Sequence, residues 1–204
     1  MSRQLTEEEI DDLIYSARID DLDTLKSSVE RLSEDLSQPE AEVLLHAIDP
    51  YSKSTPLHMS CANGHLDIVE YILSKFPAAP SAGNLSIVTL QNDSGNTPLH
   101  WACLNGHQKI IERLCDCGAD PFVKNMAGQD CFFQAENNEK LDVVDYLLQR
   151  FQEVLEEDGN VAAGQEDAEL PSPVRTENKD HEDKPDTSVI GENLENMDIN
   201  EKGI

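Results

Sequence analysis

Apolar residues recur at helical spacing through the first three quarters of the chain, and they define pairs of short helices. In one pair the first helix begins at Pro98 and is ended by Gly106. Proline is tolerated in the first turn of a helix, and glycine permits the left-handed residue that ends one. The second helix is predicted over about 108–117, with an apolar face formed by Ile110, Ile111 and Leu114.

The same pair occurs more than once. Residues 55–65 return as 97–107, with Thr-Pro-Leu-His, a cysteine and Asn-Gly-His kept in place. Weaker copies of the apolar spacing precede and follow these two. We therefore predict four units near 5–36, 50–77, 92–121 and 125–151, which bury their apolar faces by stacking on one another.

Small residues on the first helices indicate that neighbouring units approach closely, namely Ser60, Cys61, Ala102 and Cys103. The two strong copies are 42 residues apart, nine more than the spacing of 33 to the weaker copy that follows. The extra residues fall in 77–92, which contains Pro77, Pro80 and Gly83. This insertion is expected to be a loop.

After about residue 152 the pattern stops. Residues 152–204 hold 16 acidic and 4 basic side chains and few apolar ones, too few to offset the entropy of ordering the chain. We predict a repeat domain over 1–151 and a disordered acidic tail over 152–204. Within the tail, 188–199 has enough apolar residues to form a helix on a partner, although a solvated linear segment is the favoured interpretation.

The formal net charge of −26 disfavours binding to nucleic acid and to anionic membranes, and it favours basic protein partners. The start MSRQLTEEEI has no signal-peptide pattern, and no segment has the length and apolarity to span a bilayer. Five cysteines, mostly within apolar patterns, suit a reducing compartment. A soluble protein of the cytoplasm and nucleus, monomeric when free, is expected.

No catalytic signature is present, so an enzyme is not expected. The histidines His58, His65, His100 and His107 are not spaced as zinc ligands, and neither a metal nor another cofactor is predicted. Instead, His58 and His100 are placed to hydrogen-bond the threonine that caps their helix and a neighbouring turn, which would tie one unit to the next.

The aromatic residues divide into two groups. Phe122, Phe132, Phe133 and Tyr146 are interpreted as core. Trp101 has two equally supported interpretations, packing between first helices or anchoring an interface from a half-exposed position.

Thr-Pro-Leu-His, Gly-His, an aliphatic second helix and Gly118-Ala119-Asp120-Pro121 together resemble the ankyrin repeat. The resemblance implies an all-α ankyrin-repeat solenoid whose first and last units are degenerate caps. It also implies that partners bind at the turn tips and on the exposed side of the first helices. The corresponding residues here are Tyr51, Ser52, Lys53, Ser54, Asp93, Ser94, Asn96, Met126, Gln129, Ala62, Asn63, Leu104, Asn105, Asn137 and Asn138, and Trp101 is added to them as the possible interface anchor.

These positions are mostly uncharged, so the acidity that would attract a basic partner must lie elsewhere. The candidates are Glu7, Glu8, Asp12, Asp20 and Asp21 near the amino terminus, and Glu153, Glu156, Glu157 and Asp158 at the start of the tail. Acidic residues early in a helix also stabilise its dipole, which explains part of the first set.

Two full units with an insertion between them, degenerate flanking units and an acidic tail are similar to a small yeast ankyrin-repeat chaperone of a newly made ribosomal protein. That resemblance implies one-to-one binding of a basic client, the third protein of the small ribosomal subunit, whose RNA-binding surface would be masked before assembly. A generic ankyrin adaptor in signalling or transcription, and an ankyrin regulatory subunit of an enzyme, stay open as alternatives. The loop over 77–92 is the only candidate for an enzyme-inhibiting element.

Overall fold

The structure is a computed structural model of the chain, and it describes residues 3–76 and 87–157. The chain divides into two compact units, Met1–Val161 and Ala162–Ile204, and all described residues belong to the first. The predicted disorder of the tail and the segment 188–199 lie outside the described residues.

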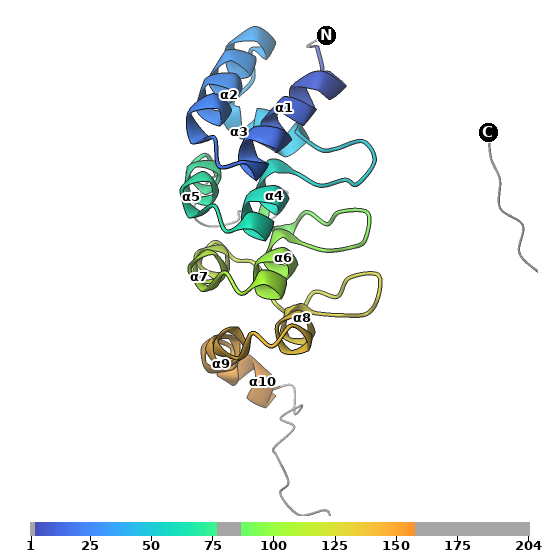
Figure 1. Cartoon of the computed structure of the whole chain (residues 1–204), viewed down its shortest axis with the longest axis vertical. Coiled ribbons are helices and arrows are strands. Elements are labelled where there is room, and N and C mark those ends of the chain that lie inside the picture. The colour runs from blue at the N-terminus through green and yellow to red at the C-terminus, as the bar shows by residue number, and fades with distance from the viewer. Residues whose placement is uncertain (1–2, 77–86, 158–204) are drawn as a thin grey trace, which may run out of the picture. The chain divides into compact units, whose positions relative to one another are not determined.

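Four pairs of antiparallel helices follow one another in the described part of the chain, which contains no strand (Figure 1). The inner helices are α1 (Glu7–Arg18), α4 (Pro56–Asn63), α6 (Pro98–Asn105) and α8 (Cys131–Asn137). The outer helices are α2 (Leu22–Leu36), α5 (Leu66–Ser74), α7 (Gln108–Asp116) and α9 (Leu141–Arg150). Three short helices complete the set: α3 (Glu40–His46), the 3₁₀ helix η1 (Ile87–Thr89) and α10 (Gln152–Glu157). The prediction of an all-α repeat fold is confirmed.

The inner helices begin and end where the sequence predicts. Thr55 and Thr97 precede α4 and α6, and proline occupies the first turn of each helix. Gly64 and Gly106 follow these helices in the left-handed conformation, with φ of 83° and 78°. Because the pairs are bounded by local signals, their limits depend little on what packs around them.

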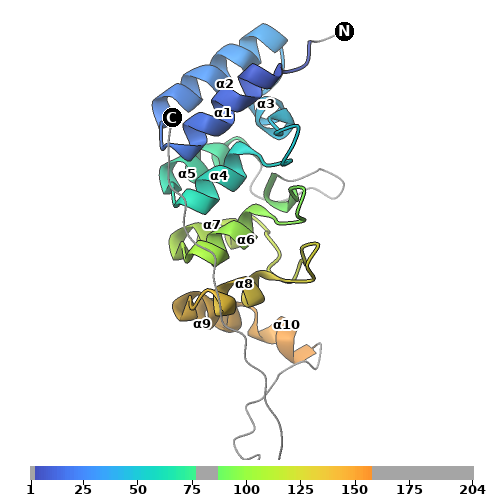
Figure 2. The ribbon, with the colours of Figure 1, turned by 45° about the vertical axis from the view of Figure 1, so that its right-hand side comes forward.

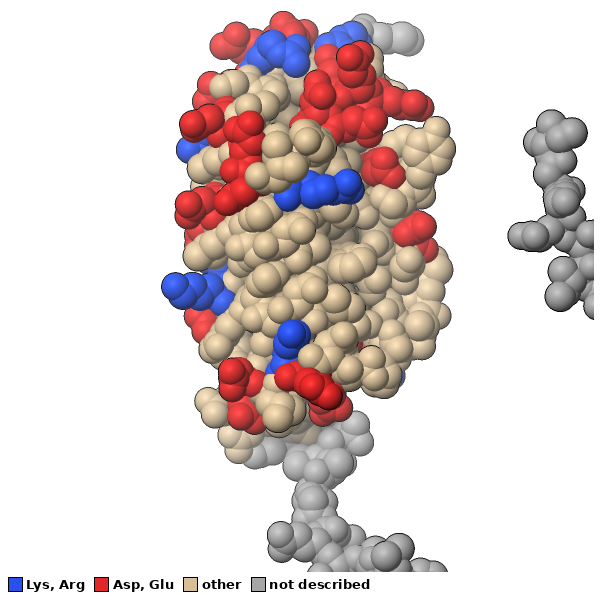
Figure 3. All heavy atoms as spheres, in the orientation of Figure 1, with Lys and Arg blue, Asp and Glu red and all other residues tan. Residues whose placement is uncertain are grey.

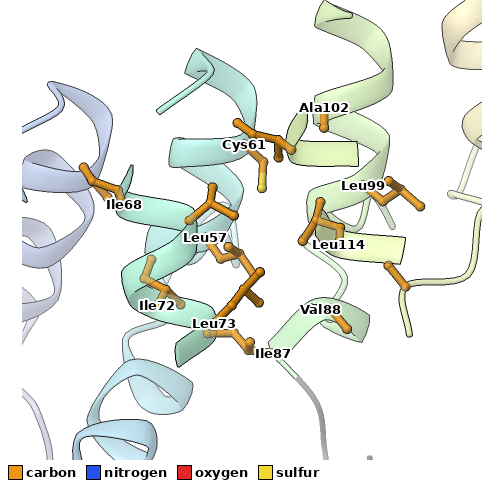
Figure 4. Close-up of a cluster of buried hydrophobic side chains, with 14 of the residues drawn as sticks. Leu57, Cys61, Ile68, Ile72, Leu73, Ile87, Val88, Leu99, Ala102 and Leu114 are labelled. Carbon is orange, nitrogen blue, oxygen red and sulfur yellow. The ribbon is translucent and has the colours of Figure 1, made fainter. Parts of the chain in front are cut away.

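The small residues of the inner helices lie at the contact between units. Ser60, Cys61, Ala102 and Cys103 are all fully buried, as the close approach of α4 and α6 requires. Leu57 and Leu99 from the same helices join aliphatic side chains of the outer helices in one continuous core (Figure 4). The prediction that stacking creates the core is confirmed.

Part of the insertion at 77–92 is not a loop. Residues 87–89 form η1, and the side chains of Ile87 and Val88 are buried in the same cluster as Leu73 (Figure 4). Two adjacent β-branched apolar residues gain more from burial than they lose in chain entropy, so they close the side of the second unit. The prediction of a loop was wrong for these residues, while 77–86 lie outside the described part.

A second inserted element, α3, lies between the first and second units and was not predicted. Its Val43 and Leu44 are fully buried against the core. The carboxylate of Glu40 lies 2.8 Å from the ammonium of Lys75 and accepts a 3.2 Å hydrogen bond from the hydroxyl of Tyr71. These contacts attach α3 to the outer helix α5.

Aromatic residues gather at the end of the last unit. The rings of Phe122 and Phe132 stack at 5.4 Å, and Phe151 meets Phe122 edge to face at 5.8 Å. Phe133, interpreted from the sequence as core, is instead 43% exposed. It is the third residue of α8, and its neighbour Phe132 packs against the core. Within the described residues, no helical pair follows α9 to cover the exposed ring.

Candidate partner-binding site

Three loops that precede the inner helices project on the same side of the stack (Figures 1 and 2). They are joined by backbone hydrogen bonds, from the N–H of Asp93 to the carbonyl of Ser52 at 2.9 Å and from the N–H of Met126 to the carbonyl of Ser94 at 3.0 Å. The loop tips therefore form one connected row. Tyr51 is 81% exposed and Met126 80% exposed at its two ends.

Histidine side chains hold the loops against the inner helices. In His58, Nδ1 accepts the backbone N–H of Thr55 at 3.2 Å and lies 2.9 Å from its hydroxyl, while Nε2 lies 3.1 Å from the carbonyl of Asn96 in the next loop. His100 repeats this arrangement with Thr97 and the carbonyl of Gln129. The predicted tie between units is confirmed.

A second set of histidines links each unit to the preceding one. His65 Nε2 lies 2.8 Å from the carbonyl of Arg18, and His107 Nε2 lies 3.2 Å from the carbonyl of Ala62. Each histidine thus meets the end of the previous inner helix, where carbonyls lack helical partners. Within the described residues, no group of three or more histidine, cysteine or acidic side chains is arranged to hold a metal ion.

The exposed face of the inner helices is an apolar and amide surface. Met59 and Trp101 occupy equivalent positions on α4 and α6, and both are partly buried. The indole N–H of Trp101 is covered and has no hydrogen-bond partner, while the rest of the residue keeps some exposure. Trp101 therefore combines features of both of its predicted roles.

Asparagines end three of the inner helices in the same way. The side-chain N–H groups of Asn63, Asn105 and Asn138 donate to the carbonyls of Met59, Trp101 and Gln134, at 2.8, 3.0 and 2.8 Å. Each amide side chain is fixed by this bond, and its oxygen accepts no hydrogen bond from the described residues. The three side-chain amide oxygens therefore form an ordered row of hydrogen-bond acceptors.

Charge on the inner helices is concentrated in α1. This helix carries five acidic side chains and one basic one, α4 and α6 carry none, and α8 carries only Glu136. Figure 3 shows acidic side chains gathered over α1, a basic side chain at their lower border, and a mostly uncharged surface beyond it over α4 and α6. The acidic region and the apolar region are thus separate parts of one face.

The acidic candidates near the amino terminus differ in what they contact. Glu7, Glu8 and Asp12 are exposed, and they form no ion pair with residues 3–76 or 87–157. Asp21 caps α2 by accepting the N–H of Thr24 at 3.0 Å, and Asp20 lies 3.5 Å from His65. These last two carboxylates are therefore already engaged in contacts that stabilise the fold.

Glu9 also serves the fold. Its carboxylate receives hydrogen bonds of 2.8 and 2.9 Å from the guanidinium of Arg3 and one of 2.9 Å from the backbone of Thr6. The Arg3 side-chain bond, above all, lowers the pKa of Glu9 to about 2. This carboxylate completes the capping box of α1.

A hollow of about 410 Å³ lies where the acidic and apolar regions meet. It is lined by residues of α1, by the loop before α4 and by Met59, and the α1 residues are Asp11, Asp12, Ile14, Tyr15 and Arg18. The guanidinium of Arg18 lies 3.5 Å from the sulfur of Met59. The sequence reasoning missed Tyr15 and Met59. Counting back 44 residues from Met59 leads to Tyr15, so the repeat spacing contained a signal for this pair.

The remaining candidate residues differ in how exposed they are. Ser54 is only 3% exposed, so its contribution to a partner surface is small. Ala62 and Leu104 are partly exposed on the inner helices, and Asn137 is exposed on α8. Lys53 is exposed, Asn96 and Gln129 are partly buried, and Glu153 is exposed on α10. The side chains of Glu156 and Glu157, and all of Asp158, lie outside the described residues.

The candidate binding face therefore consists of the three loop tips and the exposed sides of the inner helices. None of the helices within 3–76 and 87–157 combines the length and apolarity needed to cross a bilayer.

A sequence model described as "Ankyrin repeats (3 copies)" matches residues 13–125 and 82–158. The chain is 46% identical over 159 residues to the ankyrin repeat-containing protein YAR1 of Saccharomyces cerevisiae, covering 77% of this chain and 76% of that protein. An ankyrin repeat-containing protein of Schizosaccharomyces pombe is 31% identical over 140 residues, covering 69% of this chain and 84% of the relative.

A solved structure is also similar. A chain in the crystal structure of yeast ribosomal protein Rps3 in complex with its chaperone Yar1 superposes with a TM-score of 0.65 and 41% identity. The match covers 72% of this chain and 96% of that one. Together with the helical pairs, the caps and the histidine ties, these similarities show that the chain belongs to the ankyrin-repeat family.

Proposed function

We propose that this protein is the chaperone of a newly made basic ribosomal protein of the small subunit, the counterpart of yeast Rps3. The observation that carries the proposal is the similarity to the structure of Rps3 with its chaperone, which spans 96% of the matched chain at 41% identity. At that identity and coverage, the surface used for a partner is expected to be retained along with the fold.

The distribution of charge supports the same function. An unassembled ribosomal protein presents a basic surface that normally contacts RNA, and such surfaces aggregate and bind RNA nonspecifically. The acidic side chains of α1 provide one complementary surface, and the 16 acidic residues of 152–204 provide a second. The client is therefore covered on its RNA-binding face until assembly.

The proposal also assigns a role to each group of candidate contact residues. The loop tips and the exposed side of α4, α6 and α8 would hold the client, and Glu7, Glu8 and Asp12 would attract it. Asp20 and Asp21 contribute less, because both are engaged in the turn that joins α1 and α2. A client that is made in the cytoplasm and assembled in the nucleus requires a chaperone present in both compartments.

Neither alternative from the sequence has a specific observation in its favour. An adaptor for two non-basic partners does not account for the acidity of α1. The hypothesis of an inhibitory loop over 77–92 is weakened, because Ile87 and Val88 of that stretch are buried in the core.

The direct test mixes the full chain with recombinant yeast Rps3. We expect a one-to-one complex by size-exclusion chromatography with light scattering, and suppression of Rps3 aggregation at physiological salt. Lysozyme, a basic protein unrelated to the ribosome, serves as the control and should not bind. If no complex forms, or if lysozyme binds equally well, the proposal is wrong.

The role of the tail needs a separate test. A variant ending at Glu157 keeps every described residue and removes most of the acidic tail. It should still bind Rps3, but RNA should displace it at lower concentrations than it displaces the full chain. Equal resistance of both chains to RNA would contradict a masking role for residues 158–204.

A further inference from the structure

Two of the inner helices end in a chemically reactive pair of residues. Asn63-Gly64 and Asn105-Gly106 are the two Asn-Gly sequences of the chain. In such a sequence the backbone nitrogen of glycine attacks the side-chain amide carbon of asparagine. Glycine permits this attack most readily, because it has no Cβ atom in the way and its backbone is the least restricted.

The reaction needs only water. A bond forms between the glycine nitrogen and Cγ of the asparagine, the Cγ–Nδ2 bond breaks, and ammonia leaves with the proton of the glycine N–H. Water then opens the cyclic imide at either carbonyl. One product is aspartate in a normal backbone, and the other is isoaspartate, in which the backbone runs through the former side chain.

At the end of α4 the structure engages both reacting groups. The N–H of Gly64 donates to the carbonyl of Ser60 at 3.0 Å, and the amide of Asn63 donates to the carbonyl of Met59 at 2.8 Å. The amide therefore points toward the preceding turn of the helix, away from the glycine that follows it.

The end of α6 repeats this arrangement. The N–H of Gly106 donates to the carbonyl of Ala102 at 2.9 Å, and the amide of Asn105 donates to the carbonyl of Trp101 at 3.0 Å. The side chains of Asn63 and Asn105 are nevertheless exposed, so water reaches both. Protection from deamidation therefore depends on the hydrogen bonds that end each helix, and burial contributes little to it.

The last unit provides an internal comparison. Asn138 is the counterpart of Asn105, and its amide makes the same bond, to the carbonyl of Gln134 at 2.8 Å. The residue after it is Glu139, whose side chain hinders attack by the backbone nitrogen. Asn138 therefore has the same hydrogen bond without the reactive sequence.

The turn at each Asn-Gly sequence is also a contact between units. A Cβ atom added at Gly64 would lie 2.7 Å from the ring of His107, and one added at Gly106 would lie 2.8 Å from the side chain of Lys140. In addition, Nε2 of His107 lies 3.2 Å from the carbonyl of Ala62. An isoaspartate adds a backbone atom to such a turn, so the neighbouring units can no longer pack in the same way.

We propose that Asn63 and Asn105 are deamidation sites that react only when the end of α4 or α6 opens. In the closed repeat the glycine nitrogen and the amide carbon are held apart, and in the open repeat they meet. The product lacks the amide N–H that bonded to the helix, and it places a negative charge at the negative end of the helix dipole. A repeat that has reacted is therefore less stable, and the covalent change is an irreversible record of its opening.

The test follows the wild-type full chain at mildly alkaline pH, with and without urea, by mass spectrometry of its peptides. In urea, Asn63 and Asn105 should convert at similar rates, at least about tenfold faster than Asn138. In the native chain both should slow by roughly a hundredfold or more, because only the open fraction reacts. Conversion of either site in the native chain at its rate in urea would overturn the inference.

Hydrogen exchange of the two glycine amides provides a quantitative check. Exchange of the N–H and attack by the nitrogen both require an opened and deprotonated glycine, so the two protection factors should agree within about tenfold. Exchange at Gly64 and Gly106 is measured by NMR under the same conditions. A larger difference in either direction would contradict opening of the helix end as the barrier.

The effect of the product is tested with Asn63→Asp and Asn105→Asp. Each should lower the urea midpoint of unfolding more than Asn137→Asp does. This control adds the same charge at the end of α8, at an exposed side chain that donates no hydrogen bond within the described residues. Equal midpoints for the three variants would show that the lost amide bond has no effect. None of these measurements involves Rps3, so their failure and the failure of the proposed function are distinguishable.

Discussion

Single histidine side chains join each repeat to both of its neighbours. His58 reaches forward to the loop of the next unit, and His65 reaches back to the end of the previous inner helix. Nε2 of His58 faces the carbonyl of Asn96 and can donate to it in either protonation state, but Nδ1 accepts the N–H of Thr55, so protonation of the ring would break that contact. The connection between units therefore depends on one tautomer.

This arrangement predicts a pH-dependent stability. Burial lowers the pKa of His58 to about 4, whereas an unfolded histidine titrates near 6.5. Between these values the unfolded chain binds a proton that the folded chain does not. The contribution of His58 is therefore complete above about pH 6.5 and is lost as the pH falls toward 4.

From pH 7 to pH 5 the loss due to His58 is roughly 2 kcal/mol of unfolding free energy. Urea denaturation at both pH values measures it, and His58→Gln, which cannot titrate, provides the control for all other groups. The wild type should lose more stability than the variant over this step. Equal losses would show that His58 titrates normally in the folded protein.

Two loop glycines separate the effect of backbone conformation from that of close packing. Gly95 and Gly128 have nearly the same φ, 76° and 75°. A Cβ atom added at Gly95 would lie 2.7 Å from the backbone nitrogen of Met126, whereas one at Gly128 would meet nothing within 4 Å. Only the second position has room for a side chain.

Alanine at Gly128 should therefore cost only the conformational term, about 1–2 kcal/mol of unfolding free energy. Alanine at Gly95 should cost distinctly more, because the next loop must also move. Thermal or urea unfolding of the two single variants gives the comparison. If both lose the same amount, the close contact between the loops contributes nothing to stability.

At the scale of elements, the inserted segments are part of the core. The burial of Ile87 and Val88 in η1, and of Val43 and Leu44 in α3, closes sides of the stack that regular repeats would leave open. Truncating Ile87 to alanine should lower the free energy of unfolding by about 2–4 kcal/mol. Urea denaturation measures the loss.

The control for this prediction is Leu141→Ala, since Leu141 is 67% exposed on α9. It should change stability by less than about 0.5 kcal/mol, as surface substitutions usually do. A small effect at Ile87, similar to that at Leu141, would mean that η1 does not contribute to folding.

Ion pairs connect successive outer helices but are exposed. Arg113 pairs with Glu70 at 2.9 Å and Arg150 with Asp116 at 2.7 Å, each joining an outer helix to the preceding one. Pairs of this kind contribute about 0–1 kcal/mol. The buried contacts between α4 and α6, with residues such as Cys61 and Ala102, therefore dominate the cohesion of the repeats.

At the scale of the whole repeat domain, stability is expected to vary with position. A unit in the middle of a stack has neighbours on both sides, and a terminal element has one. Amide hydrogen exchange followed by mass spectrometry should find α6 and α7 the slowest to exchange and α10 the fastest. Equal protection of α6 and α10 would mean that the domain opens only as a single cooperative unit.

The sequence alone determined the pairs of helices, their caps and the ties between units. The helices and caps depend on residues close together in the chain, such as Thr97, His100 and Gly106. The ties join residues far apart in the chain, as His100 and Gln129 are, but they follow once the units are known to repeat. The same reasoning identified most of the candidate binding surface, because a repeat places equivalent positions on one face.

Only the tertiary structure decided what lies against each side chain when the repeat is interrupted. Ile87 and Val88 are buried because a neighbouring unit provides a surface for them, and Phe133 is exposed because no helical pair follows α9 in the described part of the chain. Likewise, the sequence contains Asp12 and Trp101 far apart, and their place on one continuous face results from the stacking of α1, α4 and α6. Burial depends on neighbours, and a local pattern does not specify them.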